Sequence, residues 1–160
     1  MRLYFLRHGL AGEREDWRGD DAQRPLTPEG IKKMEREAKT IARLELGLDA
    51  IVTSPLVRAA QTARIVADEL QLRDVLVEDA NLGLDFDLGR LRSVIENHPA
   101  ADALMLVGHE PSMSRTLGQL VGGARIDLKK GALACADVDP LSLRGQLLAL
   151  VPPKLLAMKA

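Results

Sequence analysis

The sequence predicts an α/β fold, a three-layer αβα sandwich in which helices cover both faces of a central, mostly parallel sheet. Short apolar segments of strand length alternate with longer segments whose apolar residues recur at helical spacing. Residues 103–107 (ALMLV) are continuously apolar, which is typical of a strand buried on both faces. The 160 residues suffice for a sizeable core, so we expect one domain over 1–160.

The first strand and the loop after it differ in composition. Residues 2–6 (RLYFL) predict a buried strand that leads to Arg7, His8 and Gly9. Residues 10–24 are polar and charged without a sustained period, so they predict a loop in which Trp17 is the one large apolar anchor.

Two helices, separated by a strand over residues 49–53, are expected next. Thr27 suits the N-cap, and Pro28 the first turn, of a helix that stops near Gly47. Ser54, followed by proline, is expected to cap a second helix that extends to about residue 70.

The second half of the chain continues the alternation with a strand, an irregular segment, a helix, the apolar strand, a turn, a helix and two closing strands. These segments are 75–77, 78–86, 88–95, 103–107, 108–111, 113–121, 131–138 and 146–151. We expect the two closing strands to run antiparallel to the others.

Composition disfavours several classes of function. The chain has 22 Lys and Arg against 23 Asp and Glu and an aromatic content of 2%, so neither a nucleic acid nor a membrane surface is an expected partner. No secretory signal or membrane-length apolar segment is evident, and the cytoplasm is the expected compartment. The single cysteine, Cys135, excludes an internal disulfide and lies in an apolar segment, which predicts a core residue.

Side chains from three distant segments are expected at one edge of the sheet, because open α/β sheets bind ligands beyond the carboxyl ends of their strands. The first strand leads to Arg7 and His8. The second leads to Arg58, one turn into its helix, and the late apolar strand leads to His109. Two histidines and two arginines should therefore converge.

Arg58 is unusual because a cation in the first turn of a helix is disfavoured by up to about 1 kcal/mol. An anion shared with nearby backbone amides would explain it. The alternative is that Arg58 reaches solvent or pairs with a carboxylate, and a surface ion pair is equally open for Arg7.

His8 and His109 each neighbour a glycine, and Gly9 would let the backbone approach a ligand closely. A metal site is the rival interpretation of the pair, but the adjacent arginines would repel a metal ion, so we expect none. The third histidine, His98, lies in a polar connection and has no expected role.

Four motifs resemble signatures of the histidine phosphatase (phosphoglycerate mutase-like) superfamily and occur in that family's order. They are Arg7-His8-Gly9, Arg24-Pro25-Leu26-Thr27-x-x-Gly30, Ser54-Pro55-x-x-Arg58-Ala59-x-Gln61-Thr62 and Gly108-His109-Glu110-Pro111. The short length and the Arg-Pro-Leu-Thr element are similar to the SixA type of phosphohistidine phosphatase.

The resemblance implies that His8 attacks phosphorus and forms a phosphohistidine, which water then hydrolyses. Arg7, Arg58 and His109 would surround the phosphoryl oxygens, with Arg24 as a further cation from the loop. No metal or other cofactor is needed where arginines supply this charge.

One departure bears on the substrate. Larger members of the superfamily carry a glutamate acid where this chain has Leu84. Asp85 or Asp87 would be the substitute acid, or else a loop residue and a helix cap. Without a strong acid a P–O bond to an alkoxide breaks slowly, whereas imidazole leaves readily once protonated. A phosphohistidine on a protein, reached at an open rim, is therefore the expected substrate.

Two alternatives remain open at this point. One is a phosphomonoesterase that acts on a small phosphorylated metabolite. The other is a phosphoprotein-binding module without turnover. A mutase is disfavoured, because no extra segment is evident that would hold a sugar phosphate for re-transfer.

Overall fold

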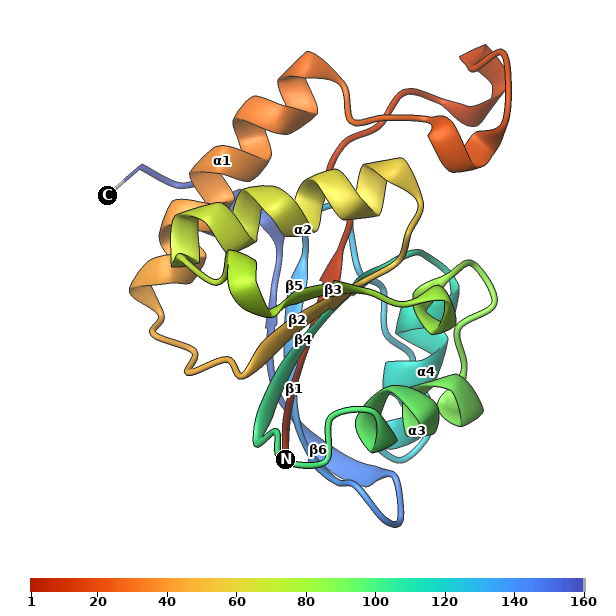
Figure 1. Ribbon diagram of the computed structural model, residues 1–160, viewed down its shortest axis with the longest axis vertical. Helices are drawn as coiled ribbons and strands as arrows, with labels where there is room; N and C mark the ends of the chain where they lie inside the picture. Colours follow the sequence, from red (N-terminus) through yellow and green to blue (C-terminus); the bar gives the residue numbers. More distant parts are fainter. Residues whose placement is uncertain (160) are drawn as a thin grey trace.

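The computed structural model describes residues 1–159 and contains a six-stranded sheet with helices on both sides (Figure 1). The strands lie in the order β3-β2-β4-β1-β5-β6. Their bounds are β1 Arg2–Arg7, β2 Ala50–Thr53, β3 Leu76–Glu78, β4 Ala103–Gly108, β5 Leu133–Asp139 and β6 Arg144–Val151. The first four strands are parallel to one another, and β5 runs antiparallel to them, as expected. The expectation fails for β6, which is antiparallel to β5 and therefore runs in the same direction as the first four strands.

Helices α1 and α2 cover one face of the sheet, and α3 and α4 cover the other (Figure 1). The helices are α1 Pro28–Arg43, α2 Val57–Leu70, α3 Leu88–Glu96, α4 Ser112–Leu120 and α5 Pro153–Leu156. The predicted three-layer αβα arrangement with a mostly parallel sheet is thus confirmed.

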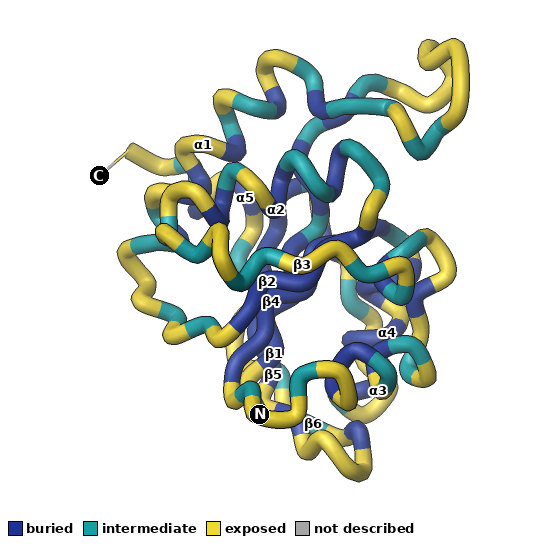
Figure 2. The backbone as a smooth tube through the Cα atoms, viewed as in Figure 1, coloured by how far each residue is buried: buried dark blue, intermediate teal, exposed yellow. Residues whose placement is uncertain are grey.

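Two hydrophobic clusters hold these layers together, one on each face of the sheet. Because successive strand residues point to opposite faces, Leu3 and Phe5 of β1 join the cluster under α3 and α4, whereas Tyr4 and Leu6 join the one under α1 and α2. Cys135 is buried in the second cluster. Figure 2 shows the buried residues concentrated along the central strands.

The first helix begins where the sequence predicts. The Thr27 hydroxyl accepts a hydrogen bond from the Gly30 amide at 2.9 Å, and proline occupies the first helical position. Its end differs from the prediction, since α1 stops at Arg43 rather than near Gly47. The chain already turns at Glu45, whose φ of 49° is left-handed.

The start of the second helix also differs. Helix α2 begins at Val57 with Leu56 as its N-cap, so the prediction that Ser54 caps it is wrong. The Ser54 hydroxyl instead accepts from the Leu56 amide at 3.2 Å and contacts a histidine from another strand, as described below. Arg58 is consequently the second residue of the helix rather than the end of its first turn.

The segment between β1 and α1 is more ordered than a plain loop. It contains two short 3₁₀ turns, Arg14–Asp16 and Asp21–Gln23. An isolated bridge between Ala11 and Leu26 closes its base. We call residues 11–26 the β1–α1 loop.

Candidate active site

The two expected histidines follow neighbouring parallel strands. Arg7 of β1 lies opposite Gly108 of β4, and the His8 amide donates to the Gly108 carbonyl at 3.1 Å. His8 and His109 therefore leave the same edge of the sheet side by side. Their ring centroids are 5.3 Å apart.

His8 is buried and has one ring nitrogen fixed by the backbone. Its Nδ1 lies 2.7 Å from the Gly9 carbonyl oxygen. Because a carbonyl only accepts, Nδ1 carries the proton of the neutral ring and Nε2 keeps a lone pair. Burial lowers the pKa of His8 to about 3, and the nearby His109, Arg58 and Arg7 charges act in the same direction. The His8 ring is therefore neutral at neutral pH, with an unprotonated Nε2.

His109 is 1% exposed and is held from a different element. Its Nε2 lies 2.8 Å from the Ser54 hydroxyl, which also accepts from the Leu56 amide. When the Ser54 hydroxyl donates to Nε2, Nδ1 carries the proton of the neutral His109 ring. Burial, followed by the charge of Arg58, lowers the pKa of His109 to about 4.

Arg58 is held by a residue that the sequence analysis missed. Its Nη1 donates to the backbone carbonyl of Asp21 at 2.9 Å, and its Nη2 donates to the Asp21 carboxylate at 3.1 Å. The side chain of Arg58 is 4% exposed. The expected alternative, a carboxylate partner, is therefore present. Nothing in the sequence singles out Asp21 except its place three residues before Arg24.

Arg24 binds the other oxygen of the same carboxylate. Its Nε donates to Asp21 at 3.0 Å, and its Nη1 donates to the Gly12 carbonyl. Burial opposes ionisation of Asp21, but the hydrogen bond from Arg24 and the charges of both arginines together lower its pKa. Asp21 thus joins Arg24 of the β1–α1 loop to Arg58 of α2.

Arg7 is anchored by the chain segment that precedes β5. Its Nη1 donates to the Leu128 carbonyl at 2.9 Å, and burial lowers its pKa. The amide of Gly131 donates to the carbonyl oxygens of Arg7 and His8 at 3.2 and 3.1 Å. These bonds fix the end of β1 where the functional side chains begin.

Three buried nitrogen atoms of this cluster have no hydrogen-bond partner within residues 1–159: Arg7 Nε, Arg58 Nε and His109 Nδ1. Buried polar groups are nearly always paired, so three such atoms in one cluster call for an explanation. Each belongs to a side chain whose other end is anchored by the protein. An anion that accepts hydrogen bonds from them fits this arrangement.

A sequence profile of the histidine phosphatase superfamily (branch 1) matches residues 3–86. The chain belongs to this superfamily. A relative in Picosynechococcus sp. is 38% identical over 141 residues, which cover 83% of this chain and 82% of that protein.

Solved structures share the fold of this histidine phosphatase. The protein histidine phosphatase SixA, solved with tungstate, superimposes with a TM-score of 0.86 at 23% identity, covering 98% of this chain and 99% of that one. The α-ribazole phosphatase of Shigella flexneri gives 0.76 at 18% identity, covering 96% and 97%. The same fold thus carries phosphatases with different named substrates.

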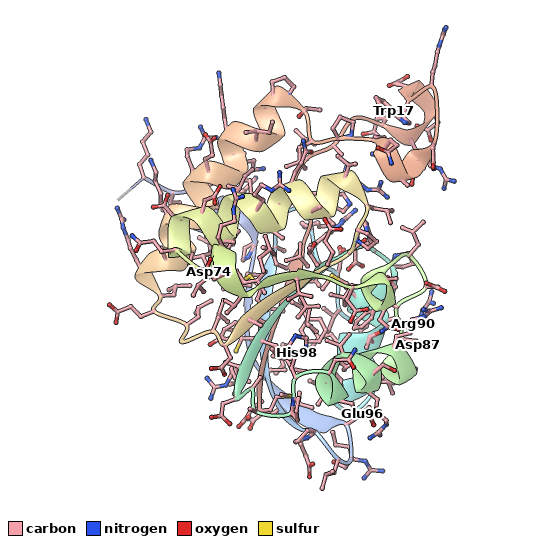
Figure 3. All side chains as sticks on the ribbon, viewed as in Figure 1. Trp17, Asp74, Asp87, Arg90, Glu96 and His98 are labelled. Carbon is pink, nitrogen blue, oxygen red and sulfur yellow. The ribbon has the colours of Figure 1, made fainter. Side chains whose placement is uncertain are left out.

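The two expected substitute acids have other contacts. Asp87 caps α3 by accepting from the Arg90 amide at 2.8 Å, and the Asp85 carboxylate pairs with the Arg90 guanidinium in an exposed position. Figure 3 shows Asp87 and Arg90 together on α3. Both aspartates therefore take the loop and cap roles that were the alternative.

A different carboxyl belongs to the residue that follows His109 in the chain. Glu110 follows His109 directly, and its Oε1 accepts from the Ser114 amide at 3.1 Å. Burial raises the pKa of Glu110, while the Ser114 hydrogen bond and the Arg7 charge oppose this. In the sequence Glu110 stands out only as part of a motif, because burial of a turn residue leaves no periodic signal.

Other site types are not seen in this histidine phosphatase. Among the described residues, no three His, Cys, Asp or Glu side chains group so that they could hold a metal ion. No helix over residues 1–159 has the length and apolar character to span a membrane. His98 lies in the connection from α3 to β4, with Nδ1 2.9 Å from the Val94 carbonyl, and Figure 3 shows it well apart from Trp17.

Proposed function

We propose that this histidine phosphatase removes the phosphoryl group from phosphohistidine on a protein, with His8 as the nucleophile. The observation that carries the proposal is the neutral His8 ring, whose Nδ1 is held by Gly9 and whose Nε2 lone pair is free. A nucleophile of this kind needs no base to activate it.

The chemistry divides into two displacements. His8 Nε2 attacks phosphorus, the P–N bond of the substrate breaks, and the leaving imidazole takes up a proton. Water then attacks the phosphorylated His8, the P–Nε2 bond breaks and inorganic phosphate leaves. Arg7, Arg58 and His109 offer the unpartnered nitrogens that would stabilise charge on the phosphoryl oxygens in both steps.

The contacts of the two aspartates favour a substrate that releases imidazole over one that releases an alkoxide. Asp85 and Asp87 are engaged at α3, so neither supplies an acid aimed at the histidines. An imidazole leaving group needs less help from an acid than an alkoxide does. The lack of a free aspartate at this position therefore supports a substrate with a P–N bond, such as phosphohistidine.

A direct comparison of substrates tests the proposal. The wild type should hydrolyse a phosphohistidine protein with a higher kcat/KM than p-nitrophenyl phosphate or sugar phosphates. His8→Ala should lower this activity by at least about 10³-fold, while His98→Ala, the matched control, should not. Preference for a phosphomonoester would overturn the substrate assignment, and activity that survives His8→Ala would overturn the nucleophile.

Glu110 favours a second candidate function, hydrolysis of a small phosphomonoester. Its half-buried carboxyl directly follows His109 in the chain, burial raises its pKa, and in its protonated form it would be a proton donor for an alkoxide. In that case Glu110→Gln should lower turnover of phosphomonoesters far more than turnover of phosphohistidine. Equal effects on the two substrate classes would show that Glu110 is not the proton donor, and its role would then be the hydrogen bond to Ser114 alone.

A further inference from the structure

The β1–α1 loop is fixed at its base and at its tip. The Leu26 amide donates to Gln61 of α2 at 2.8 Å, and the Thr27 amide donates to the Leu10 carbonyl at 3.0 Å. At the tip, the Trp17 indole Nε1 donates to the Asp20 carbonyl at 2.9 Å. The loop therefore presents a defined surface.

This surface carries a hollow of about 240 Å³. It is lined mostly by apolar atoms of the residues Gly12, Glu13, Asp16, Trp17, Arg24, Pro25, Leu26, Thr27 and Pro28. Trp17 is 38% exposed although its one polar atom is already bonded, so what it shows to solvent is apolar ring. An exposed tryptophan in an apolar hollow is typical of an interaction surface.

Arg24 connects the hollow, through Asp21, to Arg58. Its side chain lines the hollow, while its guanidinium bonds to Asp21, which in turn holds Arg58. A group bound in the hollow would thus lie next to the Arg24–Asp21 contact, and Asp21 holds Arg58, which is proposed to bind the phosphoryl group.

Size and charge define the occupant. At about 240 Å³ the hollow is smaller than the 300–1,000 Å³ usual for whole small-molecule ligands, and it suits a single side chain. Its acidic members are Glu13, whose nearest cation is Lys130 at 3.9 Å, and Asp16, which has no ion pair within residues 1–159. A basic neighbour of the bound side chain would complement these carboxylates.

We propose that the hollow around Trp17 binds an apolar side chain of the phosphorylated protein, next to a Lys or Arg that pairs with Asp16. This inference rests on the proposed function, because it assumes a polypeptide substrate. It makes Trp17 and Asp16 specificity determinants that do not touch the reacting atoms.

Short synthetic peptides that carry one phosphohistidine provide the test. Leu is placed at successive positions before and after the phosphohistidine, with Arg beside it, and kcat/KM is compared with that of an all-Ala peptide. We expect one position of Leu relative to the phosphohistidine, called the register below, to raise kcat/KM about tenfold, equivalent to about 1.4 kcal/mol. Most of this gain should come from a lower KM. Trp17→Ala should abolish this gain, Trp17→Phe should restore much of it, and free phosphohistidine should be hydrolysed equally by all three proteins.

Two controls separate the possible outcomes. Leu141→Ala changes an apolar residue that is 83% exposed in the turn after β5, at the opposite sheet edge, and should have no effect. Asp16→Lys should remove the benefit of Arg, whereas Glu15→Lys, next to the hollow but outside its lining, should not.

Absence of any register preference, or an equal loss on peptide and free phosphohistidine, would overturn the inference while the proposed function stands. If the wild type hydrolyses none of the phosphohistidine substrates, the proposed function itself has failed.

Discussion

Arg58 and Asp21 are joined by two hydrogen bonds, one to the backbone carbonyl of Asp21 at 2.9 Å and one to its carboxylate at 3.1 Å. The carboxylate also accepts from Arg24 at 3.0 Å. Two guanidinium groups that would otherwise repel each other are thereby held together. One end of the Arg58 side chain is fixed, and its Nε has no hydrogen-bond partner in the described part of the chain.

Removing the charge of Asp21 should therefore impair activity through Arg58. Asp21→Asn is expected to lower kcat/KM by about tenfold or more, since small misplacements of a positioning group cost this much. Asp68→Asn is the matched control, because Asp68 pairs with Arg73 in an exposed position. A kcat/KM equal to that of the wild type, with unfolding also unchanged, would contradict the positioning role.

The pKa of His8 predicts the form in which the enzyme works. Burial lowers this pKa to about 3, so the ring should stay neutral through the range in which an ordinary histidine, near 6.5, takes up a proton. An NMR titration of the His8 ring protons in the free protein, assigned with His8→Ala, should show no transition between about pH 5 and 8. A midpoint near 6.5 would rule out the buried neutral ring.

Glu37 predicts an unusual dependence of stability on pH. It is 1% exposed, its Oε2 has no hydrogen-bond partner among residues 1–159, and burial raises its pKa to about 8 against the opposing charges of Lys33 and Arg36. The folded state therefore binds more protons than the unfolded chain between about pH 4.5 and 8. The stability that comes from the raised pKa is present below this range and is lost as the pH rises through it.

Glu37→Gln should remove the loss of stability at high pH, because glutamine does not ionise. We expect the variant to be more stable than the wild type at pH 9 by on the order of 2 kcal/mol, with a much smaller difference at pH 5. Urea unfolding at the two pH values measures this. The same difference at both values would mean that ionisation of Glu37 plays no part.

Gly30 allows the β1–α1 loop to lie against α1. A Cβ at this position would come 2.0 Å from the carbonyl oxygen of Leu10, a backbone atom that must then shift. Gly30→Ala is expected to lower the free energy of unfolding by about 1–3 kcal/mol. Gly12→Ala in the same loop, where a Cβ meets nothing within 4 Å, should be nearly neutral. Equal stabilities of the two variants would contradict the close approach.

The layered fold could be predicted because it depends on local patterns. Apolar runs of strand length mark β1 and β4, and Thr27 with the proline after it marks the start of α1. The start of α2 was predicted wrongly, because the Ser54 hydroxyl bonds to the Leu56 amide and lies beside His109 rather than capping the helix. That choice depends on a residue 55 positions away.

The sequence by itself determined that His8 and His109 leave strand ends at the same edge of the sheet, since parallel strands bring their carboxyl ends to one edge. That the two strands are neighbours was decided by the tertiary structure. Only the tertiary structure decided that Asp21 joins Arg24 to Arg58, and which side-chain nitrogens remain buried without a partner. Strand and helix patterns arise from contacts within a few residues. The pairing of a loop carboxylate with a guanidinium 37 residues away arises from how the loop packs on α2, and no local spacing encodes that contact.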